Sequence, residues 1–310
     1  MLGDSMIFGY GVEEQDNIPT TLKIKLNEYL KQNNIESKKV QIINAGFADG
    51  KAPDTYFLYL KKVGLSLNPD LIIVNYFINN DIADLDDNIW EKTNQDGLPE
   101  KIVSKTTEIE EDYTKLKKQY QNWKITLPIL RNSHLWILFA TTLETRSPTT
   151  VAKIKNLLGT QDSLPLVTTL ENENCLFLND CSPKMHELYD EYMKILKATT
   201  DLAYDNNVSI LVALLPANPQ VKRVAQDLSE KTHKAETIFA QNEPQKRVKE
   251  FLTKITVDVI DPLPYVTDAN WPKYYFEKDG HPTREGYAKL SRAYFDFLVE
   301  NWHITQKLSK

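Results

Sequence analysis

Two runs of β-branched and other apolar residues constrain the fold of this chain more than any other feature. Leu71 to Tyr76 and Val208 to Leu215 are continuously apolar apart from single polar positions, instead of alternating between apolar and polar residues. A strand of this kind is buried on both faces, as in a parallel sheet that carries helices on each side. Because helical segments separate the strand-like runs, we predict an α/β domain with a mostly parallel sheet.

The remaining segments fit the same alternation. Helical spacing of apolar residues is present at 21–32, 53–63, 185–206 and 283–301, with a polar helical region at 220–254. Further short strands are expected at 39–44 and 257–260. We predict a single domain over 1–310, with 82–185 as an insertion or cap that shapes a binding cleft. Within the insertion, loop or exposed helix is expected at 84–87 and 92–112, and a helix beside the core at 127–143.

Charge and hydropathy exclude two classes of partner. The chain has 310 residues and a formal net charge of -6, and its basic residues are scattered among acidic ones. A protein that binds nucleic acid is instead expected to carry a basic patch. No run approaches the ~18 consecutive apolar residues of a membrane-spanning helix. We therefore expect neither nucleic acid as a partner nor a membrane span.

The N-terminus and the cysteines bear on the compartment. No basic segment followed by an apolar stretch is visible, so a cytoplasmic protein is the default expectation, or an exported one if an N-terminal segment is missing. Cys175 and Cys181 are the only cysteines. A disulfide between them would fit export, but two isolated thiols are favoured because there is no framework of cysteines. They do not make a zinc site, which needs about four ligands.

Ser5 is the candidate nucleophile. It lies in Gly3-Asp4-Ser5, and a serine at the carboxyl end of a strand presents its hydroxyl where ligands of open α/β sheets bind. The turn differs from the Gly-x-Ser-x-Gly elbow of α/β-hydrolases, since Ile7 replaces the second glycine. Taken alone, Gly-Asp-Ser is more often an ordinary turn or helix cap. Only Met1 and Leu2 precede it, so we expect a truncated first strand.

His281 is the candidate general base, because a serine hydroxyl needs a base within hydrogen-bond reach. It lies in Asp279-Gly280-His281-Pro282, just before the final helix, and Asp279 is the candidate to orient the imidazole. The alternative is a loop histidine without function.

Three donors are candidates for an oxyanion hole, which a tetrahedral intermediate requires. They are the backbone N–H groups of Ser5 and Gly46 and the side-chain amide of Asn80. Gly46 follows the strand expected at 39–44, and Asn80 follows the strand at 71–76. The carboxyl ends of parallel strands share one edge of a sheet, so these loops are expected beside Ser5.

Taken together, four segments resemble the conserved blocks of the SGNH hydrolase superfamily, also called GDSL-type esterases. They are Gly3-Asp4-Ser5 with the following residues Met6 to Val12, Asn44-Ala45-Gly46, Phe77-Ile78-Asn79-Asn80-Asp81 and Asp279-Gly280-His281-Pro282. The order is the family's order, and the resemblance spans nearly the whole chain. It implies a three-layer α/β/α flavodoxin-like sheet and no cofactor or metal. It also implies Ser5 as nucleophile, His281 as base, and Gly46 and Asn80 as oxyanion donors.

The chain departs from the family pattern at two further places. Ile78 stands where the third block usually has glycine. Lys278 stands where the last block often has aspartate, and Asp279 is two residues before His281, a spacing that resembles the polysaccharide O-acetyltransferase branches. The second departure bears on the assignment of Asp279 as the residue that orients His281, which is the weakest of the site assignments.

Three hypotheses of function follow. The first is a serine ester hydrolase that acts through an acyl-serine on O-acyl esters of a small molecule or glycan. The second is an acyltransferase to a sugar hydroxyl, motivated by the Asp279 spacing and the aromatic-rich segment Trp271 to Phe276. For Tyr274, Tyr275 and Phe276, a place in the core or its rim is the favoured interpretation. The third is a non-catalytic protein on the same fold.

Overall fold

The computed structural model describes residues 1–35, 38–48, 51–77, 80–104, 182–218, 220–222, 244–276 and 280–302. By its internal contacts the chain divides into one unit of Met1–Ile102 with Asn172–Lys310 and a second unit of Val103–Glu171. Nearly all of the second unit lies outside the described residues, as do Cys175, Cys181 and the segment 127–143. The insertion expected at 82–185 thus stays a prediction.

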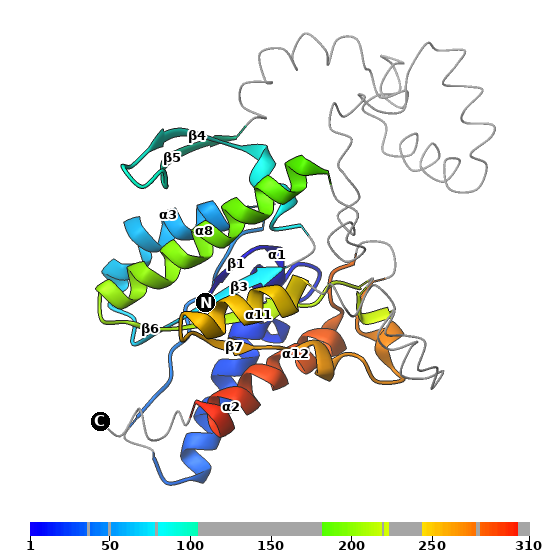
Figure 1. Cartoon of the computed structure of the whole chain (residues 1–310). Helices are drawn as coiled ribbons and strands as arrows, with labels where there is room; N and C mark the ends of the chain where they lie inside the picture. Colours follow the sequence, from blue (N-terminus) through cyan, green and yellow to red (C-terminus); the bar gives the residue numbers. More distant parts are fainter. Residues whose placement is uncertain are drawn as a thin grey trace, which may run out of the picture. The chain divides into compact units, whose positions relative to one another are not determined.

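A five-stranded sheet with the order β2-β1-β3-β6-β7 lies at the centre of the first unit (Figure 1). Its strands are β1 (Leu2–Gly3), β2 (Ala45–Gly46), β3 (Leu71–Phe77), β6 (Ser209–Leu215) and β7 (Asp258–Ile260). Every neighbouring pair is parallel, which confirms the predicted fold class. The order is the flavodoxin-like one, and ligands of such sheets bind beyond the strand ends near the switch point between β1 and β3.

The two apolar runs of the sequence are β3 and β6, and they pair along their whole length, from Leu71 with Ser209 to Phe77 with Leu215. Their side chains alternate between two separate cores, because successive residues of a strand point to opposite faces. Val74 belongs to one core and Ile73 to the other. Both strands are therefore buried on both faces, as their continuous hydrophobicity predicts.

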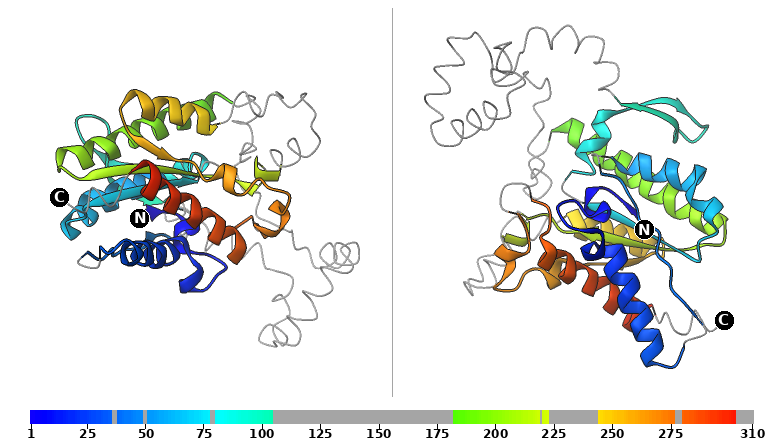
Figure 2. Two further views of the ribbon diagram at one scale, coloured as in Figure 1. Left: turned by 90° about the horizontal axis from the view of Figure 1, so that it is seen from below. Right: turned by 180° about the vertical axis from the view of Figure 1, so that it is seen from behind.

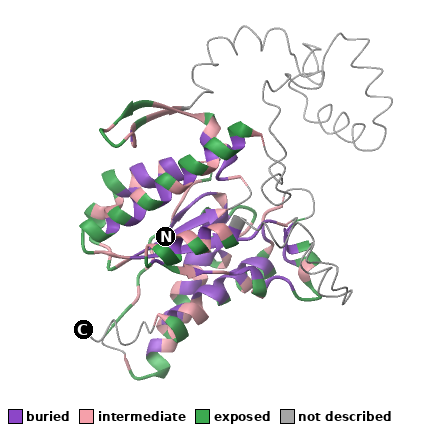
Figure 3. Cartoon of the chain, viewed as in Figure 1, coloured by how far each residue is buried: buried purple, intermediate pink, exposed green. Residues whose placement is uncertain are grey.

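Helices cover both faces of the sheet and complete three layers. One face carries α3 (Pro53–Lys62), α8 (Pro183–Asp205) and α11 (Pro244–Lys254). The other carries α1 (Ser5–Phe8), α2 (Ile18–Gln32) and α12 (Arg284–Asp296). Figure 2 shows from another direction that α2 and α12 lie across the sheet from α8 and α11. Figure 3 shows the buried strands between helices whose exposed residues face outward.

The main helices begin at capping residues that the sequence supplies. The side chain of Asn17 accepts a hydrogen bond from Thr20 N at the start of α2 (2.8 Å), and Thr283 accepts one from Gly286 N at the start of α12 (3.3 Å). Ser182 caps α8 in the same way, with Pro183 in the first turn. Such caps satisfy backbone donors that the helix itself leaves unpaired.

A buried asparagine ties the short strand β1 into the molecule. Asn75 of β3 donates to Leu2 O (2.6 Å) and accepts from the hydroxyl of Tyr294 on α12 (2.5 Å). The side chains of Asn75 and Tyr294 are fully buried. A buried amide is stable only when it is hydrogen-bonded, so these partners make Asn75 a polar link between β1, β3 and α12.

The prediction of a strand at 39–44 is wrong, because the strand in this region is β2, Ala45–Gly46. Asn27 of α2 takes the hydrogen bonds that a strand neighbour would make. Its amide donates to Val40 O and accepts from Val40 N, both at 2.9 Å. The segment is therefore fastened to a helix by a side chain, which apolar patterning does not reveal.

The prediction of loop or exposed helix at 92–112 is wrong at 92–93 and 99–104, which lie in strands, and correct at 94–98, which form the turn between them; 105–112 lie outside the described residues. Strands β4 (Asn88–Thr93) and β5 (Pro99–Ser104) form a two-stranded sheet. The turn between them has Gly97 at a φ of 68° and a hydrogen bond from Asn94 N to Leu98 O (2.9 Å). Lys92 pairs with Glu100 across the strands (2.6 Å), a contact that charge counting along the chain does not register.

A recess of about 310 Å³ lies at the amino-terminal edge of the sheet, lined by Met1, Ile43, Leu71 and Leu298 among others. This is the edge opposite the strand ends that lead to Ser5. None of the described helices is long and apolar enough to cross a membrane.

Candidate active site

Ser5 lies at the first position of α1, directly beyond β1. Asp4 caps this helix, since its Oδ1 accepts a hydrogen bond from Met6 N (2.9 Å). Gly9 ends the helix at a φ of 95°, a left-handed conformation suited to glycine. A side chain at position 3 would place its Cβ 2.7 Å from Ile7 Cγ1. The bare backbone of Gly3 therefore lets the helix turn back over the strand that precedes it.

The hydroxyl of Ser5 is hydrogen-bonded to the imidazole of His281. Ser5 Oγ lies 2.8 Å from His281 Nε2, although 276 positions separate the two residues in the chain. For the hydroxyl to donate to Nε2, the ring proton must be on Nδ1. The imidazole also contacts the ring of Tyr10: the two ring centroids lie 4.7 Å apart, and the angle between the ring planes is 39°.

A small hairpin holds His281 in place. Phe276 N donates to His281 O (2.8 Å), and Thr283 N donates to Tyr274 O (2.9 Å). Tyr275 and Pro282 form an antiparallel bridge between these two bonds. Gly280, directly before His281, has a φ of 77° and donates from its N–H to Phe276 O (2.9 Å). The imidazole thus projects from a backbone fixed on both sides.

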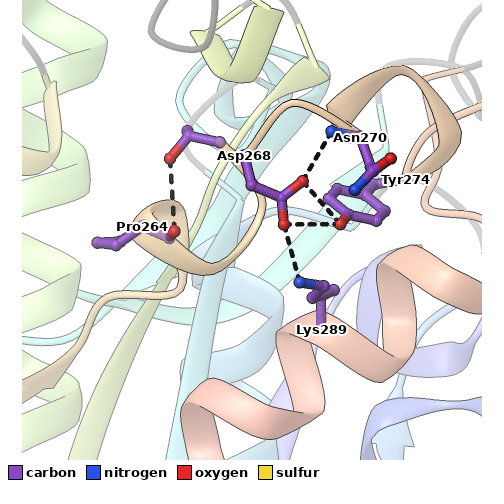
Figure 4. Close-up of polar contacts among 6 residues, drawn as sticks. Pro264, Asp268, Asn270, Tyr274 and Lys289 are labelled. Atoms are coloured by element: carbon purple, nitrogen blue, oxygen red, sulfur yellow. Dashed lines mark hydrogen bonds and ion pairs between the residues drawn. The ribbon is translucent and has the colours of Figure 1, made fainter. Parts of the chain in front are cut away.

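A polar cluster anchors the hairpin to α12 (Figure 4). The hydroxyl of Tyr274 donates to Asp268 (2.8 Å to Oδ2), and Lys289 of α12 donates to the same oxygen (2.9 Å). Asn270 N donates to Asp268 Oδ1 (2.8 Å). The bond from Lys289 is the main cause that lowers the pKa of Asp268. Asp268 therefore gathers the loop after β7, the hairpin and the last helix at one point.

Gly46 lies against the helix that carries Ser5. A Cβ at this position would be 2.2 Å from Phe8 N and 2.6 Å from Ile7 C, so glycine is required for the approach. The N–H of Gly46 donates to Asn44 Oδ1 (2.9 Å), and the amide of Asn44 reaches Phe8 O (3.3 Å). In this structure the candidate oxyanion donor is therefore engaged by a neighbouring side chain.

Asn80 lies beyond the end of β3, the neighbour of β1. Its amide Nδ2 donates to Asp84 Oδ2 (2.8 Å), and Asp84 N donates back to Asn80 O (2.7 Å). Among the described residues, no group donates to Asn80 Oδ1, which is buried. The amide has two hydrogens, so the bond to Asp84 leaves one for another acceptor.

Buried carboxylates lie behind these residues. Asp81 accepts from Phe77 N (2.9 Å) and from the hydroxyl of Tyr56 (3.0 Å). Burial raises its pKa well above the usual range, and the charges of Asp4 and Asp84 raise it further. Burial likewise raises the pKa of Asp4, although the Met6 N–H and the charge of His281 act in the opposite direction. The two hydrogen bonds of Asp81 thus hold the loop of Asn80 and Asp81 against β3 and α3.

The structure brings the predicted site residues together to different degrees. Ser5 and His281 are in direct contact, and Gly46 abuts the Ser5 helix. Asn80 follows the adjacent strand with its amide on Asp84, not on Ser5 or His281. Asp279 lies outside the described residues, so its role as an orienting carboxylate stays a prediction.

The chain has been compared with family models, curated proteins and solved structures. No family model and no curated protein matches it. One solved structure, described as a "putative lipolytic protein of G-D-S-L family" from Desulfitobacterium hafniense DCB-2, is similar over 95% of each chain. The identity is 11% and the TM-score is 0.44. A likeness this loose adds nothing to what the strand order and the hydrogen bonds show.

Sequence reasoning missed several residues of the site. Tyr10, Asn44 and Asp84 contact the predicted residues. Tyr10 and Asn44 lay inside blocks that resemble the family, without a role assigned to them, and Asp84 lay outside every block. The signal for Tyr10 was its place between Gly9 and Gly11, both of which have positive φ. Two glycines that flank an aromatic residue indicate that the backbone there adopts a special conformation, which fixes where the aromatic side chain lies. No comparable signal marks Asp84.

Proposed function

We propose that this chain is a serine ester hydrolase that acts on O-acyl esters through an acyl-serine intermediate. The observation that carries the proposal is the 2.8 Å contact between Ser5 Oγ and His281 Nε2. It lies beyond β1, at the switch point where ligands of this strand order bind. A serine paired with an imidazole base is the arrangement that acyl transfer requires. The four-block resemblance of the sequence to SGNH hydrolases supports the same assignment.

In the proposed reaction Ser5 Oγ attacks the ester carbonyl while His281 Nε2 takes its proton. The tetrahedral intermediate collapses as the imidazolium returns that proton to the departing alkoxide, which leaves the acyl group on Ser5. A water molecule then attacks the acyl-serine, again with His281 as base, and releases the acid.

The negative charge on the carbonyl oxygen needs donors fixed in advance. Asn80 keeps one amide hydrogen beyond its bond to Asp84. The N–H of Gly46 must be shared with, or released by, Asn44 when the oxyanion forms. Catalytic hydrogen bonds of a free enzyme commonly tighten only when substrate is bound.

The decisive experiment compares Ser5→Ala with the native chain on p-nitrophenyl acetate. We expect the rate to fall by at least about 10³-fold, and covalent labelling by a fluorophosphonate probe to disappear. Ser66→Ala, at an exposed serine, is the matched control and is expected to retain both. Retained hydrolysis by Ser5→Ala would overturn the proposal. Acylated sugar instead of free acid, with a glycan present, would reassign the chain as an acyltransferase.

A further inference from the structure

We propose that Tyr10 and Phe276, with the open hollow beside them, bind the alcohol part of the ester, and that this alcohol is a sugar. The inference rests on the proposed hydrolase function and extends it from the reaction to the substrate class. It concerns the leaving group and not the acyl group.

The chemistry of the candidate site determines which part of an ester faces these rings. His281 returns a proton to the leaving alkoxide, so the alcohol must lie beside the imidazole. The ring of Tyr10 lies 4.7 Å from the imidazole ring, centroid to centroid. Phe276 adjoins it through the backbone bond from its own N–H to His281 O. These two aromatic side chains therefore border the leaving-group side of the site.

Both rings are exposed, in contrast to their neighbours. Tyr10 is 47% exposed and Phe276 is 40% exposed, whereas Tyr274 and Tyr275 are buried. Of the aromatic run in the sequence, Tyr274 and Tyr275 belong to the core and Phe276 is left open. A Cβ at position 11 would approach Phe276 Cε2 to 3.0 Å, so Gly11 lets the Phe276 ring lie close against the backbone after Tyr10.

A hollow of about 520 Å³ continues from Phe276. Charged and polar groups surround the aromatic ring there, namely Glu13, Asp16, Thr283 and Arg284. Arg284 Nε donates to Asp16 Oδ1 (2.9 Å), while the Arg284 side chain remains 78% exposed. The Asp16–Arg284 pair thus presents both acceptors and donors to the hollow.

A sugar fits this combination better than an aryl or alkyl alcohol does. The C–H hydrogens of a pyranose face carry slight positive charge and are attracted to the negative face of an aromatic ring. Its hydroxyl groups need donors and acceptors around that ring, because specific sites pair an apolar surface with a few placed polar groups. An aryl alcohol would use the aromatic ring but would offer few groups that could bond to the polar side chains around it.

Binding and hydrolysis test the inference separately. The first measurement is the affinity of Ser5→Ala protein for methyl 6-O-acetylglucopyranoside, by saturation-transfer NMR titration. Adding Phe276→Ala is expected to raise Kd about tenfold. Tyr204→Ala, which removes an aromatic ring with 46% exposure on α8, is the matched control and is expected to leave Kd unchanged.

The second measurement compares this sugar ester with ethyl acetate, which has the same acyl group. In the Phe276→Ala enzyme, kcat/KM is expected to fall about tenfold more for the sugar ester than for ethyl acetate. Equal losses on both esters, or no sugar binding by Ser5→Ala protein, would overturn the inference. A loss confined to p-nitrophenyl acetate would also overturn it, in favour of an aryl alcohol. Sugar binding that depends on Phe276, without hydrolysis by the native chain, would leave the sugar site standing and refute the esterase.

Discussion

The carboxamide of Asn80 illustrates how a neighbour prepares a donor for the reaction. Asp84 Oδ2 accepts one of its hydrogens at 2.8 Å and thereby fixes the plane of the amide. A donor held in place before the reaction needs no reorganisation when charge develops on the substrate. In the proposed hydrolase, Asp84 would be a positioning residue and Asn80 the donor to the oxyanion.

Substitution of these two residues is expected to lower kcat in a graded way. Asn80→Ala removes the donor and should lower kcat by about 10²–10³-fold with little change in KM. Asp84→Ala releases the amide of Asn80 and should cost about tenfold in kcat, from roughly 1.4 kcal/mol of lost orientation. Asp84→Asn keeps an acceptor and should recover part of that loss. Steady-state kinetics on p-nitrophenyl acetate measure all three, and a raised KM at native kcat would argue for ground-state binding instead.

Asp81 predicts an unusual dependence of stability on pH. Its pKa in the folded protein is raised by burial and by the charges of Asp4 and Asp84, whereas an unfolded aspartate titrates near about 3.9. The folded state therefore holds the proton more tightly than the unfolded state. The stability that this group contributes is fully present below about pH 3.9 and is lost as pH rises through the folded pKa.

Asp81→Asn mimics the neutral acid and should remove this part of the pH profile. The free energy of unfolding in urea, measured from pH 4 to pH 8, is expected to shift in favour of the variant as pH rises. Asp70→Asn, at an exposed turn, changes the same charge and serves as control. If the free energy of unfolding of Asp81→Asn instead falls below that of the native chain as pH rises toward neutral, Asp81 acts as a stabilising anion.

At the scale of elements, the site depends on close packing between α12 and the His281 hairpin. Gly286 makes that packing possible, because a Cβ there would lie 2.0 Å from Tyr274 O. The helix and the hairpin are also linked by Lys289 and Asp268. A shift of either element would move His281 relative to Ser5, because the helix of Ser5 follows β1 and the hairpin follows β7.

Gly286→Ala should therefore impair the site more than the fold. The clash is expected to cost about 1–3 kcal/mol, offset by the roughly 1 kcal/mol that alanine gains over glycine in a helix. The rate of Ser5 labelling by a fluorophosphonate should nevertheless fall at least about tenfold, through displacement of the hairpin. Ala288→Ser on the exposed side of α12 is the control. Unchanged labelling in a destabilised Gly286→Ala protein would contradict this coupling.

Elements that bury a continuous apolar surface were predictable from the sequence, and contacts made by single polar side chains were not. β3 and β6 follow from their runs, and α2, α3, α8 and α12 follow from apolar spacing. The segment 39–44 has the composition of a strand, yet the amide of Asn27 holds it. Likewise, the approach of His281 to Ser5 was expected from family-like blocks, but the contact of the Tyr10 ring with His281 depends on three-dimensional proximity alone.

For the molecule as a whole, the bond between Tyr294 and Asn75 joins α12 to the middle of the sheet. Tyr294→Phe leaves Asn75 Oδ1 buried without this donor, which should cost about 1–3 kcal/mol of unfolding free energy. Tyr265→Phe is the matched control, because its hydroxyl bonds to Asp296 where solvent can replace it. Urea midpoints that fall equally in both variants would show that the buried link contributes nothing special.

The other bond of Asn75 has a consequence for how the molecule avoids misassembly. A ladder of two residues in β1 distinguishes poorly between neighbouring alignments, and one step along β3 shifts the chain by about 3.3 Å and reverses its faces. Such a slip would carry Ser5 out of reach of His281 while leaving most of the core intact. The amide of Asn75 donates to Ile73 O of its own strand at 3.1 Å and to Leu2 O of β1 at 2.6 Å, so the bond to Leu2 is the one that fixes the position of β1. The side chain of Asn75 therefore fixes the register of β1 and, with it, the position of Ser5. Loss of this side chain would yield folded molecules without activity.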